Sequence, residues 1–225
     1  RDLRMSRGLG DVYKRQAEMV DNLRELGIKV VVVKGPKSIA DVKENVKLIA
    51  KTLGEEDKGN LMIAKMDDKL AEIKEKVDNI KPERRKKLVL ISLMTSYGGK
   101  GCTFDDICKY AGVINGVSDA GLHNGQLLTK EMLVDINPDL LIMPVYNDHK
   151  TFDIEKYNKE FLEDPALKTL NAVKEKRFFY PREGYIYNSS QDIVFGVQEV
   201  ARAAYGSLFD QPENCHISVV AEVEK

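Results

Sequence analysis

Apolar and polar positions follow a helical period over residues 59–81. The apolar positions are Met62, Met66, Leu70, Ile73, Val77 and Ile80. Their steps of three and four place them on one narrow stripe of an α-helix, and most other positions carry Lys, Asp or Glu. Pro82 ends the predicted helix, because the residue before a proline is pushed out of the helical conformation. A helix of about 20 residues is roughly 30 Å long, which suits either a surface helix or a rigid strut between two lobes.

The residues ahead of this helix predict an α-β-α unit. One helical face is formed by Met19, Leu23 and Leu26. Gly27 is placed to close that helix, and the β-branched run at 28–33 is typical of a strand covered on both faces. Ser38 is a good N-cap residue for a second helix, which Gly54 would end. We therefore interpret residues 17–58 as the end of an N-terminal α/β lobe whose earlier strands are absent.

Residues 1–16 differ from the rest of the chain. They show no helical or strand period, and they lack both an initiator methionine and a signal-peptide pattern. We interpret them as non-native sequence and expect the natural sequence to begin near Ala17, without its true N-terminus.

Short apolar runs alternate with amphipathic stretches over residues 82–225. This alternation predicts a second α/β lobe with a mostly parallel sheet. Strands are expected at 87–93, 140–145, 178–180 and 217–220. Helices are expected after Thr103, with Asp106 completing a capping box, at 130–136, in a region broken near Pro165, and after Ser190.

Composition narrows the functional classes. The 35 basic and 36 acidic residues nearly balance, which argues against a nucleic-acid binder held by phosphate contacts. No apolar run approaches the length that crosses a bilayer. Cys102, Cys108 and Cys215 lack metal-ligand spacing, and the first two are expected to pack as small apolar residues. The sequence shows no nucleophile–base pair and no carboxylate pair for acid–base chemistry, so we expect a binding protein rather than an enzyme.

Several segments resemble the motifs of a known family. Residues 101–107 and 111–115 are similar to its G-T-F-x-D-D and A-G-G-x-N motifs, and residues 128–139 to its S-x-E-x-L and x-P-D motifs. Residues 164–179 are similar to D-P-x-W-x-x-L-x-A-V-K-x-x-R-V-Y. The order and spacing match over about residues 17–206, with the long helix ahead of them. The chain thus resembles the helical-backbone (class III) substrate-binding proteins of ABC importers, which carry iron-siderophore complexes, haem or cobalamin.

The resemblance implies two α/β lobes joined by one long helix, with the ligand in the cleft between them. Residues 59–81 would be the interlobe helix, and half of the cleft would lie outside this chain. The expected partners are a small metal complex, foremost a ferric siderophore, and an ABC permease. The resemblance further implies a monomer without a resident cofactor, either periplasmic or lipid-anchored on the outer face of the cell membrane.

Ligands of open α/β sheets bind beyond the carboxyl ends of the strands, and the loops there supply the candidate ligand-binding residues. Tyrosines offer flat amphipathic walls, and Arg and Lys offer charge-assisted hydrogen bonds to a bulky, anionic metal complex. The candidates in these loops are Tyr97, Lys100, Tyr146, Arg182, Tyr185, Tyr187 and Asn188. The resemblance adds His123 and Asn124, on a loop where family members place cleft-facing side chains. His123 is also the candidate iron ligand for a haem cargo.

Glu131 has a different expected role. It falls where the second lobe of family members offers a glutamate to arginines of the membrane permease. A glutamate in the first turn of a helix also interacts favourably with the helix dipole, so simple helix capping explains the same residue.

Other functions stay open at this point. A haem- or corrinoid-binding protein of the same family is the nearest alternative, although cobalamin-binding relatives carry an Asp and an Arg where this chain has Gly184 and Asn188. A metallocluster or chelatase-type enzyme on a similar fold would need clustered ligands, whereas the three cysteines and three histidines are scattered. An intracellular interaction module is a third alternative, which an upstream lipoprotein signal would exclude.

Overall fold

A computed structural model describes residues 17–93, 96–145, 153–182 and 184–220. The chain divides into two units, one up to Lys34 and one from Gly35 onward. In the first unit, residues 17–25 are helical, and Gly27 with a φ of 76° closes this helix as predicted. The strand expected at 28–33 is wrong, since Ile28 and Val31 to Val33 are 42–55% exposed and form no strand. β-Branched residues form a strand only where another strand satisfies their backbone groups, and the described residues provide none here.

The second unit contains a four-stranded sheet in the order β2-β1-β3-β4. Its strands are β1 (Lys87–Leu90), β2 (Ile114–Asn115), β3 (Leu140–Ile142) and β4 (Phe178–Phe179). All three neighbouring pairs are parallel, which confirms the predicted α/β class and parallel sheet. The chain leaves β1 for β2 on one side and then returns to β3 on the other. The carboxyl ends of β1 and β3 therefore form a topological switch point, where open α/β sheets bind ligands.

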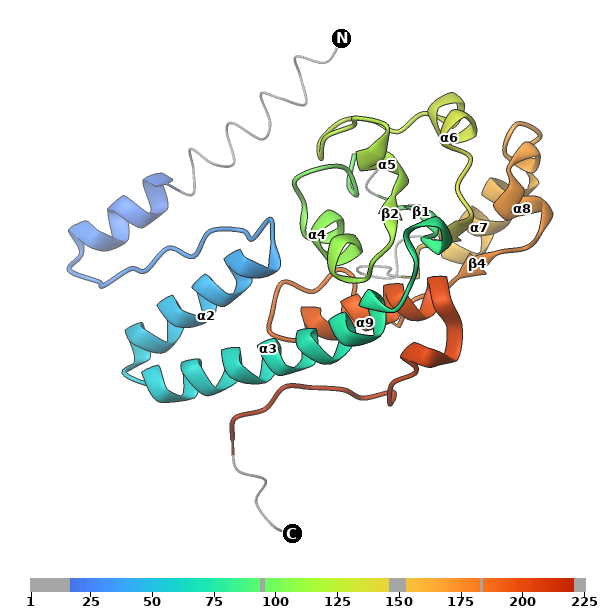
Figure 1. Ribbon diagram of the computed structural model, residues 1–225. Coiled ribbons are helices and arrows are strands. Elements are labelled where there is room, and N and C mark those ends of the chain that lie inside the picture. The colour runs from blue at the N-terminus through green and yellow to red at the C-terminus, as the bar shows by residue number, and fades with distance from the viewer. Residues whose placement is uncertain (1–16, 94–95, 146–152, 183, 221–225) are drawn as a thin grey trace. The chain divides into compact units, whose positions relative to one another are not determined.

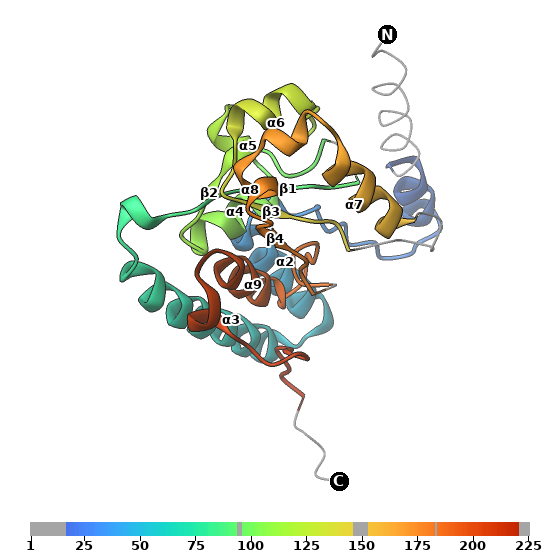
Figure 2. The same ribbon diagram turned by 90° about the vertical axis from the view of Figure 1, so that its right-hand side faces the viewer.

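Helices cover both faces of this sheet (Figures 1 and 2). One face packs against α2 (Ile39–Leu53), α3 (Glu56–Asp78), α4 (Thr103–Tyr110) and α9 (Ile193–Tyr205). The other packs against α5 (Gly116–Asp119), α6 (Lys130–Ile136), α7 (Ile154–Glu163) and α8 (Asn171–Lys174). Single-turn 3₁₀ helices are η1 (Pro82–Arg84), η3 (Leu167–Thr169) and η4 (Gly206–Phe209). Because side chains alternate along a strand, Leu88 and Leu90 enter the first core and Val89 enters the second.

The long helix α3 lies three residues nearer the N-terminus than predicted. Its apolar stripe is confirmed, and it buries Met66, Leu70, Ile73 and Val77. Gly59, the predicted first residue of the helix, lies inside it. A Cβ at this position would stand 2.4 Å from the Cβ of Ala50. The glycine therefore marks the close crossing of α2 and α3 and not a helix boundary. Lys81 is extended before Pro82, as the proline signal requires.

The N-cap predicted for α2 is confirmed, and the one predicted for α4 is wrong. Ser38 caps α2, as expected, by accepting a hydrogen bond from the Asp41 amide. The capping box of Thr103 and Asp106 does not form, because Cys102 is the N-cap residue of α4. The Asp106 carboxylate instead accepts a 2.8 Å hydrogen bond from the Ile39 amide in the first turn of α2.

The C-terminal region also departs from the prediction. Asp192, not Ser190, precedes α9 as its N-cap residue. The strand expected at 217–220 is wrong, because these residues are extended without strand pairing. They lie in a tail that follows η4 and contacts α3 and the start of α9.

The cysteines are free, and Cys102 and Cys108 are buried as small core residues, as predicted. Among the described residues, no helix combines the length and apolar character needed to cross a membrane.

Candidate functional site

A small cavity of about 70 Å³ lies at the carboxyl end of β1, beside the switch point. Its walls come from the segment after β1, the start of α6 and one side of α7. They are formed by Leu90, Ile91, Ser92, Tyr97, Leu128, Thr129, Lys130, Leu133, Tyr157 and Phe161. Hydroxyl, aromatic and apolar groups thus converge where strand order predicts a ligand.

Tyr97 and Tyr187 form an aromatic pair at this edge. Their ring centroids are 6.0 Å apart and their planes are tilted by 36°. The Tyr97 hydroxyl is 3.1 Å from the Thr103 hydroxyl. Burial raises the pKa of each tyrosine to about 12, so both phenols are neutral hydrogen-bonding groups at physiological pH. The structure therefore brings together two candidate residues from loops 90 positions apart and leaves each partly buried.

Lys100, His123 and Asn124 are also brought together, by their backbones. The Lys100 amide donates to the Leu122 carbonyl at 2.9 Å, and the Asn124 amide donates to the Lys100 carbonyl at 2.9 Å. All three side chains are exposed. Gly99 permits this approach, since a Cβ there would lie 2.7 Å from the His123 carbonyl carbon. The loops after β1 and β2 therefore present a cation, an imidazole and an amide as one set.

Arg182 and Tyr185 point elsewhere. The Arg182 side chain pairs with buried Glu199 on α9, and the Tyr185 hydroxyl bonds the backbone of Cys215 in the tail. Asn188 is half-buried and accepts a 2.7 Å hydrogen bond from the Ser190 amide. Tyr146 lies outside the described residues.

Glu131 is exposed in the first turn of α6. Thr129 caps this helix by accepting from the Met132 amide at 3.3 Å. The pKa of Glu131 is lowered, first by a hydrogen bond from its own backbone amide and then by one from Thr129. Its neighbour Lys130 is paired with Asp164 at 2.5 Å. Glu131 is therefore an exposed, charged carboxylate in the first turn of α6.

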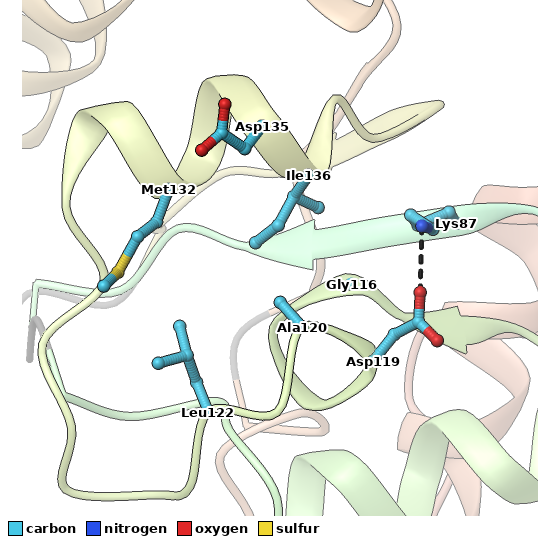
Figure 3. Close-up of a pocket in the computed structure, with 8 residues that line it drawn as sticks. All are labelled: Lys87, Gly116, Asp119, Ala120, Leu122, Met132, Asp135 and Ile136. Carbon is cyan, nitrogen blue, oxygen red and sulfur yellow. Dashed lines mark ion pairs between the residues drawn. The ribbon is translucent and has the colours of Figure 1, made fainter.

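A groove of about 350 Å³, which no sequence signal indicated, runs between α5 and α6 (Figure 3). Leu122, Met132 and Ile136 give it apolar walls, and Lys87 pairs with Asp119 at 2.9 Å at one end. Lys87 is the first residue of β1, so this end of the groove lies at the amino end of the strand. We therefore place the ligand edge at the smaller switch-point cavity and not in the groove.

No group of three or more His, Cys, Asp or Glu side chains converges in the described ranges to hold a metal ion. What the site offers is an aromatic pair, a lysine, a histidine and several hydroxyl and amide groups.

A family profile described as "Periplasmic binding protein" matches residues 10–183, more than half of the chain. The chain belongs to the periplasmic binding protein family. The resemblance seen in the sequence motifs is thereby confirmed at the level of the family.

A curated relative from Bacillus subtilis (strain 168) is named an uncharacterized ABC transporter substrate-binding lipoprotein, YvrC. It is 24% identical over 201 residues, which cover 87% of this chain and 60% of the relative. The chain thus spans about three fifths of the length of this relative.

Solved structures share the fold. The heme-binding protein RhuT from Roseiflexus sp. RS-1 aligns with a TM-score of 0.71 at 18% identity, over 84% of this chain and 71% of that one. A possible iron-binding protein from Staphylococcus epidermidis ATCC 12228 gives 0.69 at 19% identity, with the same coverages of 84% and 71%. An Fe3+-hydroxamate transport protein from Saccharomonospora viridis gives 0.61 at 18% identity, over 82% and 64%. At these identities the likeness shows the fold alone.

Proposed function

We propose that this protein is the extracytoplasmic substrate-binding component of an ABC importer and captures a ferric siderophore-type complex. The family membership and the name of the curated relative support the importer role. The same name supports a lipid-anchored location outside the cell membrane, and we expect a monomer that delivers its cargo to a permease.

The observation that carries the ligand class is the Tyr97–Tyr187 pair at the carboxyl edge of the sheet, with exposed Lys100 on the same loop as Tyr97. Two partly buried rings supply a flat apolar wall with neutral phenols, which suits the organic shell of a chelated metal. An exposed lysine supplies a charge-assisted bond to an anionic complex. The protein recognises the chelate rather than the bare ion.

A second candidate cargo is haem. His123 is exposed on the loop that pairs with Lys100, so its imidazole is accessible to an iron centre, and Lys100 is accessible to a propionate. The similar structure of RhuT is described as a heme-binding protein, which favours testing this cargo in parallel.

Ligand titration of the complete gene product tests the proposal. Intrinsic fluorescence is followed while ferric enterobactin (an anionic tris-catecholate complex), haemin or cyanocobalamin is added. We expect ferric enterobactin to quench it, and Tyr187→Ala to weaken binding about tenfold, or about 1.4 kcal/mol, because one wall of the site is lost. Tyr110→Ala is the matched control, since Tyr110 is an exposed tyrosine at the end of α4.

The alternative outcomes are distinct. A response to haemin alone that His123→Ala abolishes would assign haem as the cargo and end the siderophore proposal. Equal losses of ligand affinity in the Tyr187 and Tyr110 variants would show that the aromatic pair is not part of the ligand site. No response to any of the three probes would refute a metal-chelate cargo of these classes.

We further propose that Glu131 docks to a cation of the permease. Glu131→Gln removes only the charge, so we expect at least a fivefold slower import of the iron-55 complex into proteoliposomes, with unchanged ligand affinity. Asp68→Asn on α3 is the control, because Asp68 is an exposed acid on a different element. An unchanged import rate in the Glu131 variant would refute docking, and helix capping would then be the role of Glu131.

A further inference from the structure

The tail after η4 forms a segment without helix or strand, residues 210–220, which we call the C-terminal strap. It runs back across the second unit beside α9 and α3 (Figure 1). Phe209, fully buried, anchors its beginning, and Ile217, 6% exposed, anchors its far end. Between these anchors the strap has no secondary structure, so side chains of other elements satisfy its backbone groups.

Three elements hold the strap. From α9, the Gln198 amide donates to the Asp210 carbonyl at 2.9 Å. From the N-cap of α9, Asp192 accepts from the Ile217 amide at 2.8 Å. From α3, the Lys65 ammonium donates to the Ser218 carbonyl at 2.5 Å. The strap therefore connects the long helix to the last helix.

Two of the residues expected to contact the ligand, Arg182 and Tyr185, instead bind the middle of the strap. The Tyr185 hydroxyl donates to the Cys215 carbonyl at 2.9 Å and accepts from the Cys215 amide at 2.7 Å. Arg182 donates to the Pro212 carbonyl at 2.6 Å and lies 5.7 Å from the centre of the Tyr185 ring. Arg182 thus binds both the strap and Glu199, and the Tyr185 hydroxyl binds the strap. Both side chains lie on the side of their loop that faces α9.

Tyr185 also fixes the turn that carries Tyr187. Its ring packs on Phe195 of α9 with centroids 5.7 Å apart. Its carbonyl lies against Gly196, where a Cβ would approach within 2.4 Å. Tyr187 follows two residues later and packs on Tyr97. Strap, Tyr185 turn and aromatic pair therefore form one continuous set of contacts.

We propose that the C-terminal strap is a positioning element of the ligand site: through Arg182 and Tyr185 it holds the 184–190 turn so that Tyr187 stays against Tyr97. Arg182 and Tyr185 then act on the ligand indirectly, by placing Tyr187. The effect on ligand rests on the proposed function, whereas the effect on Tyr187 does not.

Tyrosine titration tests the positioning without any ligand. A chain ending at Phe209 lacks the strap but keeps every tyrosine, and a chain ending at Val220 is its control. Each is prepared with Tyr187 and with Tyr187→Phe, and absorbance of tyrosinate at 295 nm is read at pH 11. Since burial raises the pKa of Tyr187 to about 12, the control pair should show nearly equal absorbance. In the strapless pair we expect a difference approaching one tyrosinate, because the released Tyr187 ionises near its ordinary pKa. Equal absorbance in the strapless pair would overturn the proposal.

A point variant guards against misfolding of the truncated chain. Tyr185→Phe removes only the hydroxyl that bonds Cys215, and its melting temperature reports any general loss of stability. We expect at least tenfold faster hydrogen exchange at the amides of 184–190, with unchanged exchange in α4. Unchanged exchange in the turn would overturn the proposal whatever the truncated chain does.

Binding of ferric enterobactin separates this inference from the proposed function. We expect the strapless chain to bind it at least fivefold more weakly than the chain ending at Val220. Full-affinity binding without the strap would contradict the role in the ligand site. If the intact protein binds none of the probes, the proposed function fails, while the tyrosine and exchange measurements still decide whether the strap positions Tyr187.

Discussion

Replacing Glu199 with alanine is expected to destabilise the protein by about 3–5 kcal/mol. The Glu199 side chain is fully buried in α9 and pairs with Arg182 and Arg202. Gln211 of the strap donates a further hydrogen bond to it at 3.1 Å. Alanine would leave the Arg182 guanidinium, 23% exposed, without its carboxylate. The measurement is the free energy of unfolding from urea denaturation.

A double variant distinguishes the effect of losing the ion pair from the effect of losing side-chain volume. Arg182→Met/Glu199→Leu removes both charges and keeps most of the side-chain volume, so we expect it to recover most of the stability. Glu199→Gln is an intermediate case, because an amide oxygen still accepts from Arg182 but carries no charge. A loss below about 1 kcal/mol in the alanine variant would show that this buried carboxylate is not needed by its arginines.

Helix ends are predicted correctly where the capping residues lie close to them in the sequence. The prediction for α6 is right at both ends, where Thr129 caps its start and Asn137, in the left-handed region, ends it. For α2, Ser38 and Gly54 fix both ends in the same way. Such caps involve residues within four positions of one another, so the sequence window contains the whole interaction.

Errors arose where a residue's partner lies far along the chain. Asp106 has the right spacing for a capping box, yet its carboxylate caps a helix that begins 67 residues earlier. Gly59 serves the crossing of two helices, and Tyr185 and Arg182 serve backbone groups about 30 residues later. A backbone carbonyl is the same for every residue type, so such contacts leave no signal in the sequence.

The candidate site shows the same division. The carboxyl-edge rule led to the predictions of Tyr97, Lys100 and Tyr187, and the family resemblance led to that of His123. Which side chains then face one another depends on loop geometry, such as the close approach that Gly99 permits. An arginine or tyrosine in a loop after a strand looks the same in sequence whether it faces a ligand or a tail.

The second large effect is expected at Gly112, which joins α4 to the strand that follows. Its φ is 68°, and an added Cβ would stand 2.4 Å from Cγ1 of Val77 on α3. Val77 is β-branched and has one strongly preferred rotamer in a helix, so it cannot swing aside. Gly112→Ala should therefore cost about 1–2 kcal/mol in backbone strain and about 1–3 kcal/mol in overpacking against the long helix.

Two further variants separate these contributions. Gly121 has a φ of 82° with no atom within 4 Å of its added Cβ, so Gly121→Ala should show the backbone strain alone. In Gly112→Ala/Val77→Ala the colliding methyl is gone, and we expect the two substitutions to be about 1–2 kcal/mol less destabilising together than the sum of each alone. Urea denaturation of all four variants measures this coupling. Strict additivity would mean that α3 and the end of α4 can move apart freely, and α3 could not then act as a rigid strut on this lobe.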